Sequence, residues 1–214
     1  GLRAESGTCG ANLSWEYANG TLTITGSGPM TNFNGAGSQP WVSIRASIVQ
    51  LVLPEELTVI GDYAFAYCSK LRMVTIPSQV TRIGREAFRE CPALSRVTFA
   101  EGSKMQTIGV SAFHKCDALA SIQLPEGLVY IEASAFRACS KLSAIDIPAS
   151  VLSVGISAFQ ECTDLSKVTL HDGTQTIGKD AFYQCGNLSS VTLPESLVSI
   201  GQSAFISCTS LTSV

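Results

Sequence analysis

The stretch Ile60-Gly61-Asp62-Tyr63-Ala64-Phe65-Ala66-Tyr67-Cys68 decides the fold, because its pattern Ile-Gly-x-x-Ala-Phe-x-x-Cys returns along the chain with small changes. The Phe recurs every 23 residues, with one spacing of 25, and a Cys follows each Phe three residues later. A fixed period of this size is typical of a solenoid, in which each repeat packs only on its neighbours. The two columns are Phe65, Phe88, Phe113, Phe136, Phe159, Phe182 and Phe205, and Cys68, Cys91, Cys116, Cys139, Cys162, Cys185 and Cys208.

Each unit continues with an apolar pair separated by one residue, such as Val74 and Ile76. This alternation predicts a short strand with one buried face, and units that run in one direction predict parallel pairing. Pro77 ends the strand because proline cannot donate to a β-ladder. Equivalent strands are predicted at Leu51/Leu53, Val97/Phe99, Ile122/Leu124, Ile145/Ile147, Val168/Leu170 and Val191/Leu193.

The remaining apolar positions return the chain across the core. Leu57 and Ile60 form a second apolar pair, and Gly61 suits a turn that needs open backbone geometry. Ala64, Phe65 and Cys68 then fall on one face of an expected helix of one or two turns. We therefore predict an α/β repeat solenoid: a right-handed superhelix with a parallel concave sheet and short helical turns on the other side.

Residues 1–47 do not follow the repeat and are predicted to form a β-rich cap, which a solenoid needs at its end. Strands expected at 13–17 and 21–24 flank Asn19-Gly20, a strong hairpin signal. Pro40 suits the first turn of a short helix through 43–46. Residues 48–214 then hold seven units of about 23 residues plus a truncated eighth. Because the core would be open at Val214, we expect the native protein to continue.

Three departures interrupt the regular pattern. The third unit carries two extra residues around 100–104 and lacks the Pro, which predicts a bulged surface turn. His171 replaces a Pro, and Thr174 occupies an apolar position. Glu132 replaces the Gly after Ile131, so that turn cannot strictly require a positive φ.

Composition excludes several function classes. Charged residues make up 14% of the chain, the formal net charge is −3, and Lys and Arg form no run, which argues against nucleic-acid binding. No apolar stretch approaches the length of a membrane span. The chain starts at Gly1 without a Met, so we expect that any signal peptide has been removed.

The units resemble the BspA-type (Treponema pallidum-type) leucine-rich repeat, through Ile-Gly-x-x-Ala-Phe-x-x-Cys-x-x-Leu-x-x-Val-x-[Leu/Ile]-Pro across residues 48–214. Residues 1–47 resemble the module that precedes such arrays in secreted bacterial proteins, through Gly7-Thr8-Cys9-Gly10 and Pro40-Trp41 among others. The resemblance implies export, a place outside the cell or on its surface, and adhesion to host proteins or bacterial surfaces. It carries over no binding residue, because the shared motif is scaffold.

The aromatic and sulfur columns are better explained by packing than by chemistry. No C-x2-C pair suggests zinc, and side chains one rung apart miss disulfide geometry, so buried free thiols are expected. A Cys9–Cys68 disulfide is an open alternative. The Phe column is expected in the core rather than as a stacking platform, and Trp15 and Trp41 are expected to anchor the cap core rather than to bind sugar.

No catalytic, cofactor or metal site is predicted. His114 and His171 stand in different units without an accompanying motif and are expected on the surface or in turns. The chain shows no nucleophile elbow, phosphate loop or metal spacing. An enzyme would need a cluster of titratable residues in a cleft, and we expect a non-catalytic protein.

Variable residues on the predicted concave strands form the candidate binding face, since repeat arrays commonly bind ligands there. We expect this face to bind a protein or surface glycoprotein, and a structural spacer without a ligand is the alternative. A merely solvated sheet would show the same Thr-rich composition. The candidate residues are Gln50, Met73, Thr75, Arg96, Thr98, Gln123, Asp146, Lys167 and Thr169.

Overall fold

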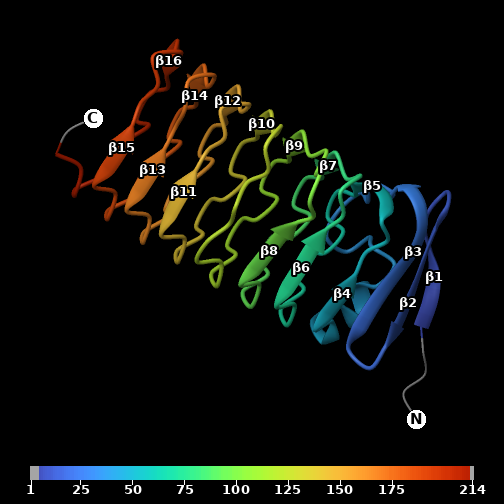
Figure 1. The fold of residues 1–214 in the computed structure, drawn as a ribbon. Helices are drawn as coiled ribbons and strands as arrows, with labels where there is room; N and C mark the ends of the chain where they lie inside the picture. Colours follow the sequence, from blue (N-terminus) through green and yellow to red (C-terminus); the bar gives the residue numbers. More distant parts are fainter. Residues whose placement is uncertain (1–4, 213–214) are drawn as a thin grey trace.

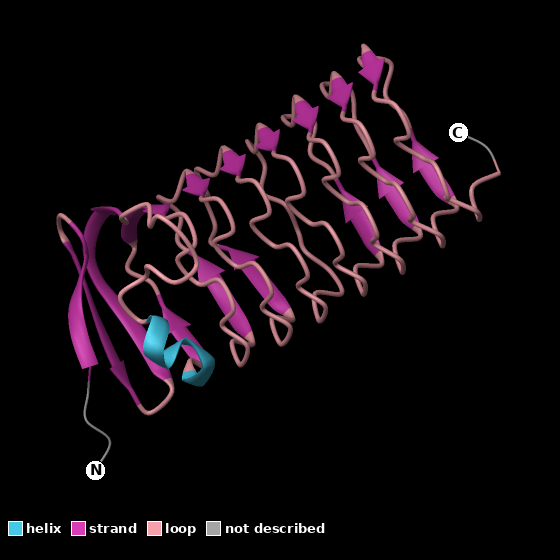
Figure 2. Ribbon diagram, turned by 180° about the vertical axis from the view of Figure 1, so that it is seen from behind, coloured by secondary structure: helices cyan, strands magenta, loops and turns pink. Residues whose placement is uncertain are grey.

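The computed structural model describes residues 5–212, which stack as successive rungs along one axis with the cap at one end (Figures 1 and 2). The expected truncated eighth unit extends to residues 213–214, outside the described residues. The cap and first rung contain β1 (Glu5–Gly10), β2 (Leu13–Ala18), β3 (Thr21–Pro29), the 3-10 helix η1 (Val42–Ser47), β4 (Gln50–Val52) and β5 (Glu56–Ile60). The later rungs contain β6 (Met73–Ile76), β7 (Arg82–Ile83), β8 (Arg96–Phe99), β9 (Thr107–Ile108), β10 (Tyr130–Ile131), β11 (Ala144–Asp146), β12 (Ser153–Val154), β13 (Lys167–Thr169), β14 (Thr176–Ile177), β15 (Ser190–Thr192) and β16 (Ser199–Ile200).

The longest sheet runs along one side of the stack and includes the cap. Its order is β1-β2-β3-β5-β7-β9-β10-β12-β14-β16, with parallel pairing from β3 onward. This ladder contains Ile60 and its equivalents in the later units. The sequence pattern predicted that these residues return the chain across the core, but it did not predict that they form strands. The register is regular: Ile83 pairs with Ile60 on one side and Ile108 on the other.

Strand β3 joins the cap to both sides of the solenoid. Thr21–Thr23 pair in parallel with β4, and Ser27–Pro29 pair in parallel with β5. The opposite edge of β3 pairs antiparallel with β2 across the Asn19-Gly20 turn, where both residues adopt positive φ. One long strand therefore pairs with both strands of the first rung, which protects backbone groups that would otherwise be unpaired.

The predicted concave sheet is parallel but is divided into pieces. β6 pairs with β8, and β11 pairs with β13 and β15. The predicted strand at Ile122/Leu124 is wrong, because residues 121–124 have no strand assignment (Figure 2). This rung follows the unit with two extra residues, which lie between the turn at Glu101-Gly102 and β9.

The expected helical turns do not form at the Ala-Phe-x-x-Cys segments. Tyr63 and Tyr67 both adopt positive φ, which an α-helix does not permit. The backbone N–H groups of Tyr63, Phe65 and Tyr67 instead donate to carbonyl oxygens of the next unit, over 2.7–2.8 Å. A row of turns bonded between rungs replaces the helix, because stacking offers these N–H groups partners outside their own unit.

The core is a spine of stacked rings, as the repeat predicted. Successive Phe centroids lie 5.2–5.4 Å apart, and from Phe88 to Phe205 the neighbouring rings are within 9° of parallel. Trp41 is fully buried and extends the spine into the cap, stacking on Phe65 at 5.4 Å and 10°. Its indole Nε1 donates to the Ala64 carbonyl oxygen. Trp41 thus fills the place that Phe takes in the units that follow.

All eight thiols are free and buried, so the alternative Cys9–Cys68 disulfide is absent. Burial raises the pKa of Cys68 to about 12 and that of Cys9 to about 11. Six thiols donate to the Phe carbonyl oxygen of the preceding unit, as Cys91 does to Phe65 over 3.2 Å. Each of these thiols therefore forms a hydrogen bond between neighbouring rungs.

The repeated Gly is required by close approach rather than by positive φ. A Cβ on Gly109 would lie 2.7 Å from the Ile83 carbonyl oxygen of the preceding rung. Glu132 takes the same position in another unit without a positive φ, so that rung accommodates a Cβ, and the close approach applies to rungs such as that of Gly109. Thr174 also fits its apolar position, because its buried Oγ1 donates to the Val151 carbonyl oxygen over 2.7 Å.

Candidate binding face

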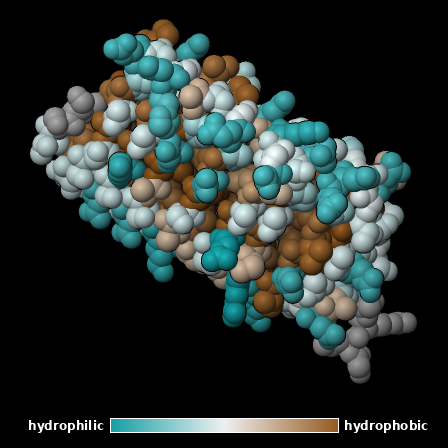
Figure 3. All heavy atoms as spheres, in the orientation of Figure 1, coloured by the Kyte–Doolittle hydropathy of each residue, from teal (hydrophilic) through white to brown (hydrophobic). Residues whose placement is uncertain are grey.

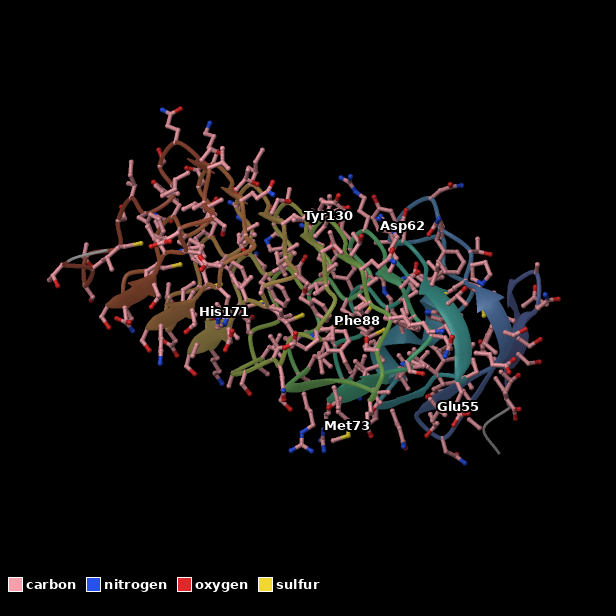
Figure 4. All side chains as sticks on the ribbon, turned by 45° about the horizontal axis from the view of Figure 1, so that its top comes forward. Glu55, Asp62, Met73, Phe88, Tyr130 and His171 are labelled. Atoms are coloured by element: carbon pink, nitrogen blue, oxygen red, sulfur yellow. The ribbon has the colours of Figure 1, made fainter. Side chains whose placement is uncertain are left out.

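The strands β4, β6, β8, β11 and β13 carry eight of the nine predicted binding residues on one side of the molecule (Figure 1). Along β6 burial alternates strictly, with Met73 and Thr75 exposed and Val74 and Ile76 buried. The period of two therefore turns the variable residues to solvent and the constant residues to the core. Figure 4 shows Met73 on the opposite side of the stack from Tyr130, with Phe88 between them.

The ladder brings the predicted residues together in small groups. Met73 lies beside Arg96 and Thr75 beside Thr98 on β6 and β8. On the second piece of the sheet, Asp146 lies beside Thr169. Lys167 occupies the first position of β13, next to Ala144 and Ser190.

Two predicted residues lie outside these pairs. Gln50 is on β4, where its Oε1 accepts a hydrogen bond from the Thr21 hydroxyl of the cap. Gln123 sits on the rung without a strand, between the two pieces of sheet. The nine residues therefore form one row along the stack rather than one compact cluster, with eight of them exposed and Thr169 half-buried.

His171 joins the face although the sequence placed it only in a turn. Its Nε2 lies 2.6 Å from Asp146 Oδ1, one rung back, and both side chains are exposed. The signal was the loss of Pro at the end of the strand. The loss of Pro does not predict that the side chain of His171 contacts Asp146 in the previous unit.

A groove along the corner after these strands was not predicted. Three adjoining hollows of about 1000, 530 and 360 Å³ form it. The first two share Ala100 and Glu101, and the last two share Gln123, Leu124 and Glu126. Apolar surface shows on this side of the molecule among polar groups in the region of β4 and β6 (Figure 3). We call the joined hollows the corner groove.

The chemistry of the described residues suits contact rather than bond making. Within residues 5–212, no three His, Cys, Asp or Glu side chains gather closely enough to hold a metal ion. The thiols are buried, and desolvation raises the pKa of the Cys139 thiol well above its ordinary value, which leaves little thiolate for nucleophilic attack. No helix in the described part of the chain is long and apolar enough to cross a membrane.

The repeat units match a known protein family. The profile of the BspA type leucine rich repeat region matches in six copies, over residues 44–155 and 129–214. The chain belongs to the BspA-type leucine-rich-repeat family. Repeat proteins of this family are in general protein-interaction modules. A search of curated protein sequences finds no match.

One solved structure supports the BspA-type fold, and two more leucine-rich-repeat structures align over the whole chain at lower scores. The crystal structure of a T. pallidum leucine-rich-repeat protein is similar with a TM-score of 0.72 and 28% identity, covering 96% of this chain and 91% of that one. A leucine-rich-repeat protein from Eubacterium ventriosum aligns over 100% of this chain and 97% of its own, at 18% identity and a TM-score of 0.48. A leucine-rich cell surface protein from Faecalibacterium prausnitzii aligns over 100% and 82%, at 19% identity and a TM-score of 0.49.

Proposed function

We propose that this chain is a non-catalytic, secreted or cell-surface protein that binds a protein or surface glycoprotein through the strand face described above. The exposed row from Gln50 to Thr169 carries the proposal. Its side chains vary from rung to rung, while the inward positions of the same strands stay apolar. A row with no role in packing is free to be shaped by a ligand.

The family supports this role at the level of interaction, since BspA-type repeats are generally protein-interaction modules. Export and adhesion rest on the resemblance of the units and of residues 1–47 to secreted bacterial proteins. We also propose that the chain is divided into an N-terminal cap, residues 1–47, and a repeat array, residues 48–214. Fold alone does not assign a ligand, so the residues must be tested.

The test replaces Arg96, Gln123, Asp146 and Lys167 together with Ala. Purified wild-type and variant protein are immobilised and exposed to host matrix proteins and to bacterial cells, and bound partners are quantified. We expect wild-type protein to retain a partner that the variant loses. We expect the variant to fold, because all four side chains are exposed and contribute nothing to the core. Circular dichroism checks that it does.

A spacer without a ligand of its own would behave differently. The four-residue variant would then bind whatever wild type binds, and only a change in the number of repeats would alter presentation of neighbouring domains. Unchanged binding by the variant would therefore overturn the proposal.

A further inference from the structure

The corner groove carries a single sign of charge. Glu55, Glu101 and Glu126 line it, and they occupy one position of the repeat, two residues after the apolar residues Leu53, Phe99 and Leu124. Glu56 and Asp146 add two more carboxylates from other positions. None of the described residues that line the groove is Lys or Arg, and His171 at its far end faces Asp146.

These carboxylates are exposed and available. Glu55, Glu101 and Glu126 are exposed, and within residues 5–212 none of them forms a salt bridge. Lys104 donates from Nζ to Oε1 of Gln79, a residue that lines the first hollow, over 2.9 Å. Arg96 and Lys167 lie outside the groove, on the strands of the open face. The charged side chains that line the groove are therefore mainly carboxylates, and Lys104 brings one ammonium group to its edge.

The floor and the length of the groove suit an extended chain. Leu51, Leu53, Val74, Phe99 and Leu124 contribute apolar lining, with Thr75 and Thr98 beside them. Rungs about 4.8 Å apart place the hollows over about 20–25 Å, the span of six or seven residues of extended polypeptide. A long groove with an apolar floor and anionic rim is complementary to a strand that alternates cationic and small apolar or hydroxyl side chains.

A turn of the repeat lies at the centre of the groove. Glu101 and Gly102 form this turn after β8, and Gly102 adopts positive φ and projects into open space. Glu101 lines both the first and the second hollow and so joins them. The regular unit before it turns at the same place, at Ser78-Gln79, but has no carboxylate there.

We propose that the corner groove binds a lysine- or arginine-rich extended segment of a partner protein. This inference rests on the proposed binding role and adds the chemistry of the partner. Glu55, Glu101 and Glu126 would pair with cationic side chains, and the floor would take the small side chains between them.

The test uses fluorescence anisotropy with a labelled peptide of about eight residues alternating Lys and Val, long enough to span the groove. Its counterpart alternates Glu and Val. The groove variant is E55Q/E101Q/E126Q. The matched control E5Q/E16Q/D164N removes the same charge from exposed carboxylates outside the groove.

We expect the Lys peptide to bind wild type and the control alike, and the groove variant about tenfold more weakly, since three exposed ion pairs are lost. Raising NaCl from about 0.05 to 0.3 M should weaken wild-type binding, because exposed charges are screened. The Glu peptide should not bind. Equal weakening by both triple variants, or no binding of the Lys peptide at about 1 mM, would overturn the assignment.

The two proposals can fail separately. Gln123 and Asp146 of the four-residue face variant also line the groove, so the double variant R96A/K167A, which changes only face residues outside it, separates the two. Loss of partner capture by this double variant, with no binding of the Lys peptide, would leave the binding role standing and remove the groove from it. Binding of the Lys peptide that depends on Glu55, Glu101 and Glu126, with unchanged capture by the double variant, would place recognition in the groove rather than on the strands.

Discussion

The thiol of Cys139 donates a hydrogen bond to the carbonyl oxygen of Phe113, one unit earlier, over 3.1 Å. The same oxygen accepts the backbone N–H of Cys116 in its own unit. The Cys column thus has a bonding role between rungs in addition to filling the core. Both residues are fully buried, so no water can replace the thiol.

Replacing Cys139 with Ala should destabilise the protein more than replacing it with Ser. Ala leaves a small cavity and removes the donor, and we expect a loss of about 1–2 kcal/mol in the free energy of unfolding. Ser keeps an O–H donor toward the Phe113 oxygen. Urea denaturation followed by circular dichroism measures both variants, and a Ser variant less stable than the Ala variant would contradict the role of the hydrogen bond.

The thiols should be unreactive until the protein unfolds. Burial raises the pKa of Cys68 and Cys185 to about 12, so neither accessible sulfur nor thiolate is present near neutral pH. Native protein treated with a thiol-reactive dye at about pH 8 should react slowly, and protein in urea should react rapidly at every Cys. Fast labelling of Cys139 in native protein would show that the column is open.

Stability should fall as the pH rises above about 9. The pKa of Cys68 is about 12 in the folded state against an ordinary value of 9.0, so the folded state holds this proton more tightly. The corresponding stability is complete below pH 9.0 and is lost between that value and about 12. Each such thiol contributes up to about 1.4 kcal/mol per pH unit in this window. Urea midpoints measured across this range check the slope, and a flat profile would contradict the burial of the column.

Trp41 should be essential for attachment of the cap. Its indole stacks on Phe65 and its Nε1 donates to the Ala64 carbonyl oxygen. Trp41→Ala should cost about 3–5 kcal/mol, whereas Trp41→Phe keeps a ring in the spine and should cost about 1–2 kcal/mol for the lost hydrogen bond. Chemical denaturation separates the two, and equal losses would show that the ring stack contributes little.

Gly109 should not tolerate a side chain. A Cβ there would lie 2.7 Å from the Ile83 oxygen and 2.9 Å from the Gly84 carbonyl carbon, both backbone atoms that cannot turn away. Gly109→Ala should destabilise by about 1–3 kcal/mol through overpacking. Gly37→Ala is the control, because no atom lies within 4 Å of its Cβ position. Similar thermal midpoints for the two variants would contradict close approach as the reason for the Gly column.

Much of the fold could be predicted from spacing because periodic apolar residues report burial directly. The 23-residue period identified the stack, and the alternation at Val74 and Ile76 identified the parallel strands. The helical turn at Phe65 was wrong, because a spacing of three and four residues describes one helical face and two consecutive turns equally well. The positive φ of Tyr63 and Tyr67 excludes the helix and leaves the two turns. A tyrosine in the sequence does not predict a positive φ.

The candidate site could be predicted only as a row of residues. Exposure of Met73 and Thr75 followed from the alternation, and their pairing with Arg96 and Thr98 followed from the equal spacing of the units. The corner groove and the contact between His171 and Asp146 could not be predicted. Both depend on how far the turn after each strand projects, which varies with the extra residues at 100–104 and with the lost Pro at 171.

The sequence by itself determined that this protein is a stack of parallel rungs with Phe and Cys inside, because identical apolar positions in successive repeats are buried when each repeat packs on its neighbours. The tertiary structure alone decided that the N–H groups of each turn and the thiol of each Cys bond to the neighbouring rung. It also decided that one continuous ladder lies opposite the divided face, and that Glu55, Glu101 and Glu126 line a single groove. These relationships join residues 22 or more positions apart, where the register between rungs, and not local propensity, places the atoms.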